Sequence, residues 1–402
     1  MNPHALPSIA MVTSMAHPQL GGVSTHLSLL IGGLRQRGHK VHLIEARVAR
    51  PPLIIRAARK AACRLAGRPY YQWLIPRMMH RLQVAVQNLD VALIHCHDPI
   101  AAAACGRIAK HKGIPMVATV HGPVSRHAVE LGSRPDSDLV RYYERIEIAA
   151  WPQCSKIIAV DSGQAGIVIE AGAPREAISV IPNAVDVDEI DALKPSYPSR
   201  RYQYFITARR LVPKNGVQYA IEALTAVQDT DCRLLIAGDG PMMAKLRELA
   251  KRLGVAEKVE FLGAQSRSAV VALTWNAVGA IVPSVNVGGV IEATSLSALE
   301  AMATGRPVIA SRLGGLAEII DDARTGFLAP QKDHAQFART MNKILSEPSM
   351  ARAVGRNARQ EVIKRFSKDR WVESVIAVYQ GAIDELSNQG ARQPVAAPTG
   401  SA

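Results

Sequence analysis

The sequence lacks several features that would assign it to a particular class of protein. Its five cysteines are scattered through 402 residues, without the spacing of a metal site or a disulfide framework. No apolar run approaches the roughly 20 residues of a membrane-spanning helix, and the first residues lack the pattern of a signal peptide. These absences argue against a disulfide-rich secreted domain and an integral membrane protein, and they predict a protein of the reducing cytoplasm.

Acidic residues are absent from a long early stretch. No Asp or Glu lies between Glu45 and Asp90, whereas nine Arg or Lys residues fall there and supply much of the net charge of +14. Residues 51–68 can form a helix with basic residues on one side and Ile, Leu and Ala on the other, which suits an anionic membrane surface. We therefore expect residues 47–81 to contact the inner face of the cytoplasmic membrane; a solvated basic helix is the alternative. Without interleaved aromatic residues or a binding motif, nucleic acid is not expected as a partner.

Aromatic residues make up only 4% of the chain, yet 48% of its residues are hydrophobic, which is enough for ordinary cores. Single cores stop growing at about 250–300 residues, so this length predicts two domains. Near-continuous apolar runs alternate with amphipathic segments, as in parallel sheets covered by helices on both faces. The fold class is therefore α/β, repeated twice. The expected strands are residues 8–12, 41–44, 92–96, 115–120, 156–160, 178–181, 204–208, 233–237, 259–262, 279–282, 307–310 and 326–329.

A stretch rich in Pro and Ser, "LKPSYPSRR" at residues 193–201, predicts the linker between the domains. The first domain would then span residues 1–194 and the second 200–370. We expect residues 371–388 to form a helix that packs back across both domains. Residues 389–402 lack apolar periodicity and are predicted to be a disordered tail.

Two glutamates, Glu292 and Glu300, stand eight positions apart in "VIEATSLSALEAMATGRPVIAS". One interpretation is structural, because Ser297 and Glu300 have the spacing of a capping box at the start of a helix. The other is functional: two carboxylates that flank free backbone amides suit a polyhydroxylated, anionic ligand. The spacing alone leaves both interpretations open.

Glycines and cations follow several predicted strands. Gly21 and Gly22 precede a predicted helix at residues 25–37, where free N–H groups can approach a phosphate, although a plain turn is an alternative. Gly240 ends a strand–helix turn at the sheet edge where open α/β folds bind ligands, but it also suits a tight connection. Arg209, Arg210 and Lys214 lie on the loop after the first strand of the second half, where they could clamp a diphosphate or be solvated.

Histidines also occur at strand ends. His95 and His97 lie on one face of a strand, which raises a metal pair, but no third ligand is at hand and we expect no metal site. His121 ends a strand and would point into the ligand crevice, or it is a hydrogen-bonded histidine at the edge of the core. The "DVD" at residues 186–188 is interpreted as the cap of a helix.

In their order and spacing, these elements resemble glycosyltransferase family 4, a family of retaining enzymes with the GT-B fold. The resemblance extends over residues 8–371. The matching segments are "GGVSTHLSLLIGGLRQRGHKV", "IHCHDP", "ATVHG", "VIPNAVD", "RRLVPKNG", "LLIAGDGP", "VEFLG" and "EATSLSALEAMATGRPVIASRLGGLAEIIDDARTGFL". It implies two Rossmann-like domains that face each other across a cleft, a nucleotide-diphosphate sugar linked to UDP or GDP as co-substrate, and neither metal nor cofactor.

The resemblance also implies roles for individual residues. Glu292 would contact the hydroxyls of the donor sugar, Glu300 would hold the ribose and Arg210 would bind the diphosphate. His121 would orient the sugar from the first domain, with Gly22 beside the reacting centre. The amides that contact the sugar or its phosphates would be those of Ala293, Thr294 and Ser295.

Three departures from the family pattern affect these roles. The phosphate-binding lysine of the family falls on Asn215, with Lys214 next to it, so the second cationic contact stays open. Residues 293–295 replace the frequent Gly-Phe-Gly, and Ala184 replaces a glycine. The donor sugar is therefore not specified by the motifs.

The resemblance predicts an enzyme that moves a hexose from a nucleotide sugar to a glycan or lipid-linked acceptor in bacterial envelope or polysaccharide synthesis. An epimerase or a phosphorylase of the same fold is an alternative, although no motif for the pyridoxal-bearing lysine of the phosphorylases is seen. A non-enzymatic basic protein that binds membrane or nucleic acid is the third interpretation.

Overall fold

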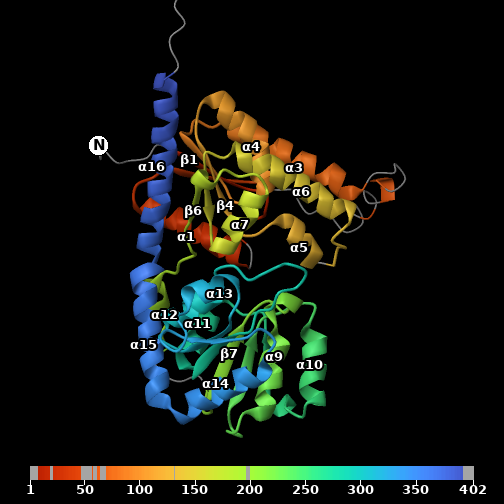
Figure 1. Cartoon of the computed structure of the whole chain (residues 1–402), viewed down its shortest axis with the longest axis vertical. Coiled ribbons are helices and arrows are strands. Elements are labelled where there is room, and N and C mark those ends of the chain that lie inside the picture. Colours follow the sequence, from red (N-terminus) through yellow and green to blue (C-terminus); the bar gives the residue numbers. More distant parts are fainter. Residues whose placement is uncertain are drawn as a thin grey trace, which may run out of the picture.

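The computed structural model describes residues 8–18, 21–46, 57, 61–63, 69–130, 132–195 and 200–392. They form two lobes, one above the other in Figure 1, each built on a parallel six-stranded sheet. Every expected strand is present, with ends no more than one residue from the predicted bounds. The strands are β1 (Ile9–Thr13), β2 (Val41–Glu45), β3 (Leu93–Cys96), β4 (Met116–Val120), β5 (Lys156–Ala159), β6 (Ile178–Val180), β7 (Tyr204–Ala208), β8 (Arg233–Ala237), β9 (Val259–Gly263), β10 (Gly279–Val282), β11 (Val308–Ser311) and β12 (Phe327–Ala329).

The strand order sets where a ligand can bind. The first sheet runs β2-β1-β3-β4-β5-β6 and the second β12-β11-β10-β7-β8-β9. The order reverses between β1 and β3 in one sheet and between β7 and β10 in the other. Open α/β sheets bind ligands beyond the carboxyl ends of the strands at such reversals. A ligand is therefore expected beyond the loops that follow β1 and β3 in the first sheet and β7 and β10 in the second.

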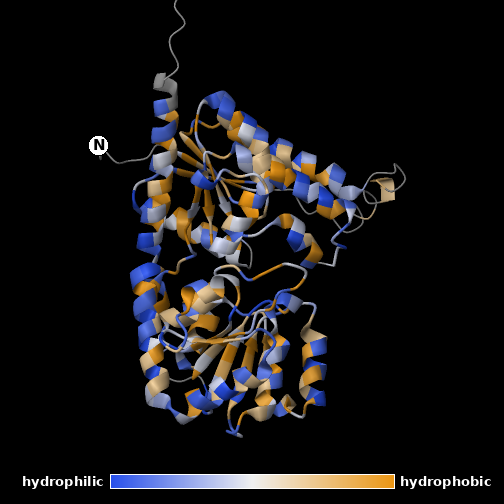
Figure 2. Cartoon of the chain, viewed as in Figure 1, coloured by the Kyte–Doolittle hydropathy of each residue, from blue (hydrophilic) through white to orange (hydrophobic). Residues whose placement is uncertain are grey.

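Helices cover both faces of each sheet, as the apolar runs predict (Figure 2). Alternate residues of β1 show why: Ile9 and Met11 pack with one helix layer, and Ala10 and Val12 with the other. The helices of the first lobe are α1 (Gly22–Gln36), α3 (Tyr70–Gln87), α4 (Pro99–Lys112), α5 (Val124–Glu130), α6 (Asp138–Ala150) and α7 (Ser162–Glu170). Those that follow are α8 (Val187–Ala192), α9 (Val217–Ala223), α10 (Met243–Arg252), α11 (Arg267–Asn276), α12 (Leu296–Ala303), α13 (Gly314–Ile319), α14 (His334–Ser346), α15 (Pro348–Arg365) and α16 (Lys368–Arg392).

The chain passes between the lobes twice, and the two passages lie side by side. The Val185 amide donates to the Phe366 carbonyl at 2.9 Å, and the Lys368 amide donates to the Val185 carbonyl at 2.9 Å. Ile190 of α8 lies in the core of the second lobe, whereas Val372 of α16 lies in the core of the first. The predicted domain bounds, 1–194 and 200–370, stay a prediction, as does the tail at 389–402, of which residues 393–402 lie outside the described residues.

Further hydrogen bonds join the lobes at the loop that precedes α12. The Thr294 hydroxyl donates to the Val160 carbonyl, and Asn183 Nδ2 donates to the Thr294 carbonyl at 2.8 Å. The Ser162 amide donates to Glu318 Oε1 at 3.1 Å. Asp161, next in the chain, is 1% exposed, and burial raises the pKa of its carboxyl to about 6. The loop that carries Glu292 is thus also part of the junction between the lobes.

The contact of α1 with α16 depends on a glycine, which gives a stability prediction. A Cβ at Gly33 would lie 2.5 Å from Val372 Cγ2, whereas a Cβ at Gly32 on the same helix would meet nothing within 4 Å. Gly33→Ala should therefore lower the free energy of unfolding by about 1–3 kcal/mol through overpacking. Gly32→Ala, the matched control, should raise it by about 0.5–1 kcal/mol because alanine favours a helix. Urea unfolding measures both changes, and equal stability of the two variants would contradict the packing account.

Candidate active site

The loops after β7 and β10 are joined by a buried ion pair. Arg209, directly after β7, places its NH2 group 2.8 Å from Glu292 Oε1, and the two side chains are only 6% and 13% exposed. Its NH1 group donates to Ser284 Oγ at 2.9 Å, and NH2 also donates to Asn215 Oδ1 at 2.8 Å. The guanidinium group is thus fixed by three partners at the reversal point of the second sheet.

The neighbouring arginine points elsewhere. Arg210, to which the resemblance gives the diphosphate, is exposed, and its carbonyl accepts from Asn215 Nδ2 at 2.6 Å. The sequence motifs place Arg209 on this loop but imply no individual role for it. Because successive side chains point in opposite directions along an extended backbone, one of two adjacent arginines after a buried strand turns inward. That alternation is the signal that could have singled out Arg209.

Lys214 and Asn215, adjacent in the chain, also have different surroundings. Lys214 Nζ lies 3.3 Å from Glu130 Oε2, which belongs to α5 of the first lobe. Burial raises the pKa of Glu130, but hydrogen bonds and positive charge from His127 and Lys214 outweigh it, so that the net pKa is lowered. Asn215 is buried and connects Arg209 with the Arg210 backbone. Lys214 therefore bridges the lobes, and Asn215 positions the two arginines.

Glu300, in α12, is paired with a second arginine that the sequence does not single out. Its Oε1 lies 2.5 Å from Arg267 Nε, and Arg267 NH1 lies 2.5 Å from Glu189 Oε1. Burial raises the pKa of Glu300, although the charge of Arg267 acts in the opposite direction. The capping-box interpretation is wrong: the carboxylate is turned to Arg267, and α12 begins after Ser295 without a side-chain cap.

A pocket of about 330 Å³ lies between the lobes beside Glu300. Its wall includes Gly32 of α1, Asp186 before α8, and Lys368 at the start of α16, together with Arg267 and Glu300. Neither Glu292 nor Arg209 is among the described residues that line this pocket. The two glutamates thus sit at neighbouring but separate positions at the lobe junction.

The segment between the two glutamates is held by a glycine pair. The Gly315 amide donates to the Glu292 carbonyl at 3.1 Å, and a Cβ at Gly315 would lie 2.5 Å from the Thr294 nitrogen. Only a residue without a side chain permits this approach of α13. Thr294 and Ser295 are buried, and Ala293 is half-buried. The segment that carries the three predicted amides is therefore packed closely against α13.

The three predicted glycines, Gly21, Gly22 and Gly240, lie at or beside the loops of this region. Gly21 is the N-cap residue of α1, and no side chain there caps the first backbone N–H groups of the helix. A Cβ at Gly22 would lie 3.7 Å from Leu296 Cδ1, so the start of α1 meets the start of α12. Gly240 packs so closely on the Leu211 carbonyl that a side chain would overlap it, and it supports the loop of Arg209.

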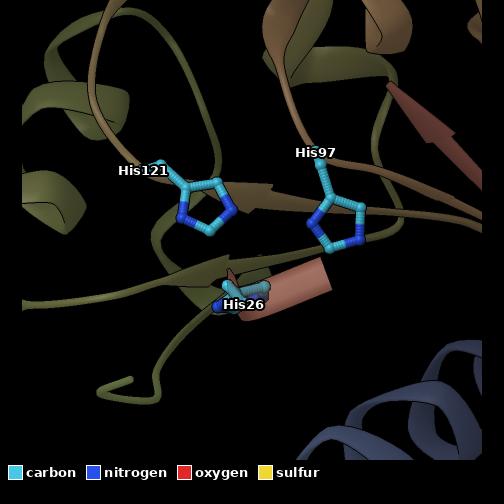
Figure 3. A group of neighbouring side chains, drawn as sticks. All are labelled: His26, His97 and His121. Atoms are coloured by element: carbon cyan, nitrogen blue, oxygen red, sulfur yellow. The ribbon is translucent and has the colours of Figure 1, made fainter. Parts of the chain in front are cut away.

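Histidines from different elements gather at the carboxyl edge of the first sheet. His121 follows β4, His97 follows β3 and His26 lies on α1, and Figure 3 shows their rings turned toward one another. Burial lowers the pKa of His26 to about 4 and that of His95 to about 3, so both rings are neutral at physiological pH. The sequence offered no third ligand for the pair of His95 and His97. The structure brings His26, from a distant helix, and His121, from the end of the next strand, to His97, and the absence of a metal site stays a prediction. Asp186, by contrast, caps α8 as predicted, since its carboxylate accepts from the Glu189 amide at 3.2 Å.

Most of the basic segment at residues 47–81 lies outside the described residues. From Tyr70 onward it forms α3, in which the Arg77 guanidinium lies 4.1 Å from the centre of the Trp73 ring. Among the helices that the structure describes, none has the length and apolar character to cross a membrane.

Comparisons with known proteins agree with this architecture. Two family profiles match consecutive parts of the chain: Glycosyltransferase Family 4 over residues 20–189 and Glycosyl transferases group 1 over residues 190–361. The N-acetyl-alpha-D-glucosaminyl L-malate synthase of Bacillus anthracis is 26% identical over 391 residues, which cover 92% of this chain and 97% of that protein.

Solved structures match the fold over nearly the whole chain. Sucrose-phosphate synthase from Thermosynechococcus elongatus has a TM-score of 0.75 at 19% identity and covers 94% of this chain and 100% of its own. The Anabaena protein HepE in complex with UDP has a TM-score of 0.69 at 19% identity, with coverages of 95% and 100%. The chain is therefore a glycosyltransferase of the GT-B fold that belongs to glycosyltransferase family 4.

Proposed function

We propose that the protein transfers a hexose from a UDP- or GDP-linked sugar to a glycan or lipid-linked acceptor, with retention of the anomeric configuration, in the synthesis of a bacterial envelope or polysaccharide glycan. The observation that carries the proposal is the position of the two glutamates. Glu292 and Glu300 flank one short segment at the lobe junction, and each is paired with an arginine. HepE was solved with UDP, which supports a uridine nucleotide as the first donor to test.

In this proposal the two carboxylates position the donor and do not act as an acid–base pair. Glu300 is held through Oε1 by Arg267, which leaves Oε2 to accept hydroxyl groups of the ribose. Glu292 is held through Oε1 by Arg209, which leaves its second oxygen for hydroxyl groups of the hexose. His121 orients the hexose from the first lobe.

Two arginines neutralise the diphosphate. The exposed Arg210 is free to reach the ligand with its bidentate guanidinium group, and the buried Arg209 supplies fixed positive charge. The amides at the start of α1, after Gly21 and Gly22, add donors and the positive end of the helix dipole. Fixed donors of this kind stabilise the negative charge that develops on the leaving phosphate.

Retention follows if the acceptor hydroxyl attacks from the face that the diphosphate leaves. The bond from the anomeric carbon to the phosphate oxygen breaks through an oxocarbenium-like state, and the new bond forms to the acceptor oxygen. The departing phosphate oxygen takes the proton of the acceptor hydroxyl. Closure of the lobes through the Thr294 contacts would exclude water and bring both halves of the site together.

Nucleotide binding tests this function. UDP or GDP should raise the melting temperature of the protein, because a ligand that binds only the native state stabilises it by about 2.7 kcal/mol at a hundredfold excess over Kd. A screen of UDP- and GDP-sugars for donor hydrolysis then identifies the hexose, and product NMR reports the anomeric configuration. Indifference to both nucleotides together with retention on heparin would contradict the proposal and favour a non-enzymatic basic protein.

Membrane association through residues 47–81 is a separate proposal, supported by the nine basic and no acidic residues between Glu45 and Asp90. Flotation with liposomes should recover the protein with anionic vesicles and not with neutral ones at physiological salt. Equal recovery with both, or with neither, would contradict the proposal.

A further inference from the structure

Three histidines that are distant in sequence turn one ring nitrogen each toward a common point (Figure 3). His26 comes from α1, His97 from the end of β3 and His121 from the end of β4. Their candidate ligand atoms all lie within 4.8 Å of one another. Among the described residues they are the one group of three or more His, Cys, Asp or Glu side chains with this geometry.

Each of the three rings has a buried nitrogen without a hydrogen-bond partner. These atoms are His26 Nε2, His97 Nδ1 and His121 Nε2. Buried polar atoms are nearly always hydrogen-bonded, so three unpartnered nitrogens in one cluster call for a ligand between them.

The outer contacts of two rings determine which nitrogen carries the proton. Asn183 uses Nδ2 to donate to the Thr294 carbonyl, so its Oδ1 is the atom that accepts from His26 Nδ1 at 2.9 Å. His97 Nε2 lies 2.7 Å from Met11 Sδ, and a thioether sulfur can only accept. Both rings therefore carry their proton on the outer nitrogen, and their inner nitrogens, His26 Nε2 and His97 Nδ1, each present a lone pair.

Acceptors that face one another need a donor or a cation between them. Neutral imidazole nitrogen is the ligand that Zn²⁺ and related ions take most often, and metal-bound histidines usually donate their outer N–H to a second partner. Here Asn183 and Met11 provide those second partners. We propose that His26, His97 and His121 bind a divalent transition metal ion, such as Zn²⁺, through these three inner nitrogens.

The geometry fits a three-histidine site with an open position. Zn–N distances of about 2.0–2.1 Å place tetrahedral ligand atoms about 3.3 Å apart, so the rings need only modest rotations to close from their present separations of up to 4.8 Å. Three protein ligands leave a fourth position for water or a substrate oxygen. Coordination through Nε2 leaves His121 Nδ1 as an N–H donor, which is compatible with its proposed contact to the sugar.

The ion would also tie the two lobes together. His26 is hydrogen-bonded to Asn183, and Asn183 to the Thr294 carbonyl in the segment between the two glutamates. A ring fixed by a metal would therefore fix the position of that segment. The ion has no part in neutralising the diphosphate, because Arg209 and Arg210 supply the positive charge for that step.

A fourth histidine provides a matched control. His95 belongs to the same cluster, with its ring centre 4.2 Å from that of His97. Its two nitrogens are already satisfied, Nδ1 by the Tyr379 hydroxyl at 2.6 Å and Nε2 by Thr119 Oγ1 at 2.8 Å. Loss of His95 removes a neighbouring imidazole but none of the proposed ligands.

The test is metal stoichiometry in the full chain. Protein stripped with a chelator is dialysed against micromolar Zn²⁺, and bound zinc is counted by mass spectrometry; Co²⁺ loaded in parallel reports tetrahedral coordination by its visible absorption. The wild type and His95→Gln should bind one ion per chain. His97→Gln and His121→Gln should lose it, with at least a tenfold weaker affinity, and circular dichroism confirms that each variant is folded.

Several outcomes would overturn the site. They are no zinc in the wild type at micromolar free metal, equal zinc in the wild type and in both ligand variants, or loss of zinc in His95→Gln alone. His121→Gln keeps the test decisive if His97→Gln fails to fold, because His121 is only half-buried. The count of bound metal is independent of transfer activity, so its failure does not affect the proposed function, nor does the failure of that function affect the site.

Discussion

The structure of the site depends on a buried ion pair between two loops that are far apart in sequence. Arg209 and Glu292 lie on the loops after β7 and β10, and neither side chain is accessible enough for water to replace its partner. Removal of one partner of a buried ion pair lowers the free energy of unfolding by about 3–5 kcal/mol, because the remaining charge stays buried without compensation. Ser284 and Asn215 satisfy the other hydrogen bonds of the guanidinium group, which makes the burial of its charge tolerable. The pair thus fixes both the direction of the Glu292 carboxylate and the distance between the loops.

Other features of the region follow from the need to hold the Glu292 segment in place. The absence of a side chain at Gly315 lets α13 reach the backbone of this segment, and the Thr294 hydroxyl and carbonyl tie it to the first lobe. Because the segment that connects the lobes also carries the carboxylates proposed to bind the donor, opening of the lobes should disturb the proposed site. Substrate binding and lobe closure are therefore expected to be coupled.

Much of the fold could be predicted from the sequence, since buried parallel strands are marked by apolar runs that depend little on distant residues. The site was predicted less completely. The motifs identify Glu292 and Glu300, but the partner of each depends on tertiary contacts: Arg267 lies 33 residues before Glu300, and the inward turn of Arg209 requires the backbone direction after β7. For the same reason the local spacing of Ser297 and Glu300 predicted a capping box that does not form. The histidine cluster could not be predicted from local sequence, because His26, His97 and His121 come from three elements that only the fold brings together.

In the proposed donor site, Arg209 takes the place of the cation that the family pattern puts at position 215, where this chain has Asn215. Donor turnover is measured in Arg209→Gln, Asn215→Lys and the double variant, with Lys251→Gln, which removes an exposed cation from the last turn of α10, as the control. Each of the first two changes should lower kcat/KM at least tenfold, equivalent to about 1.4 kcal/mol. The double variant should recover part of the loss, and the control should change little. Full activity in folded Arg209→Gln, or a double variant no better than its parents, would contradict this role of Arg209.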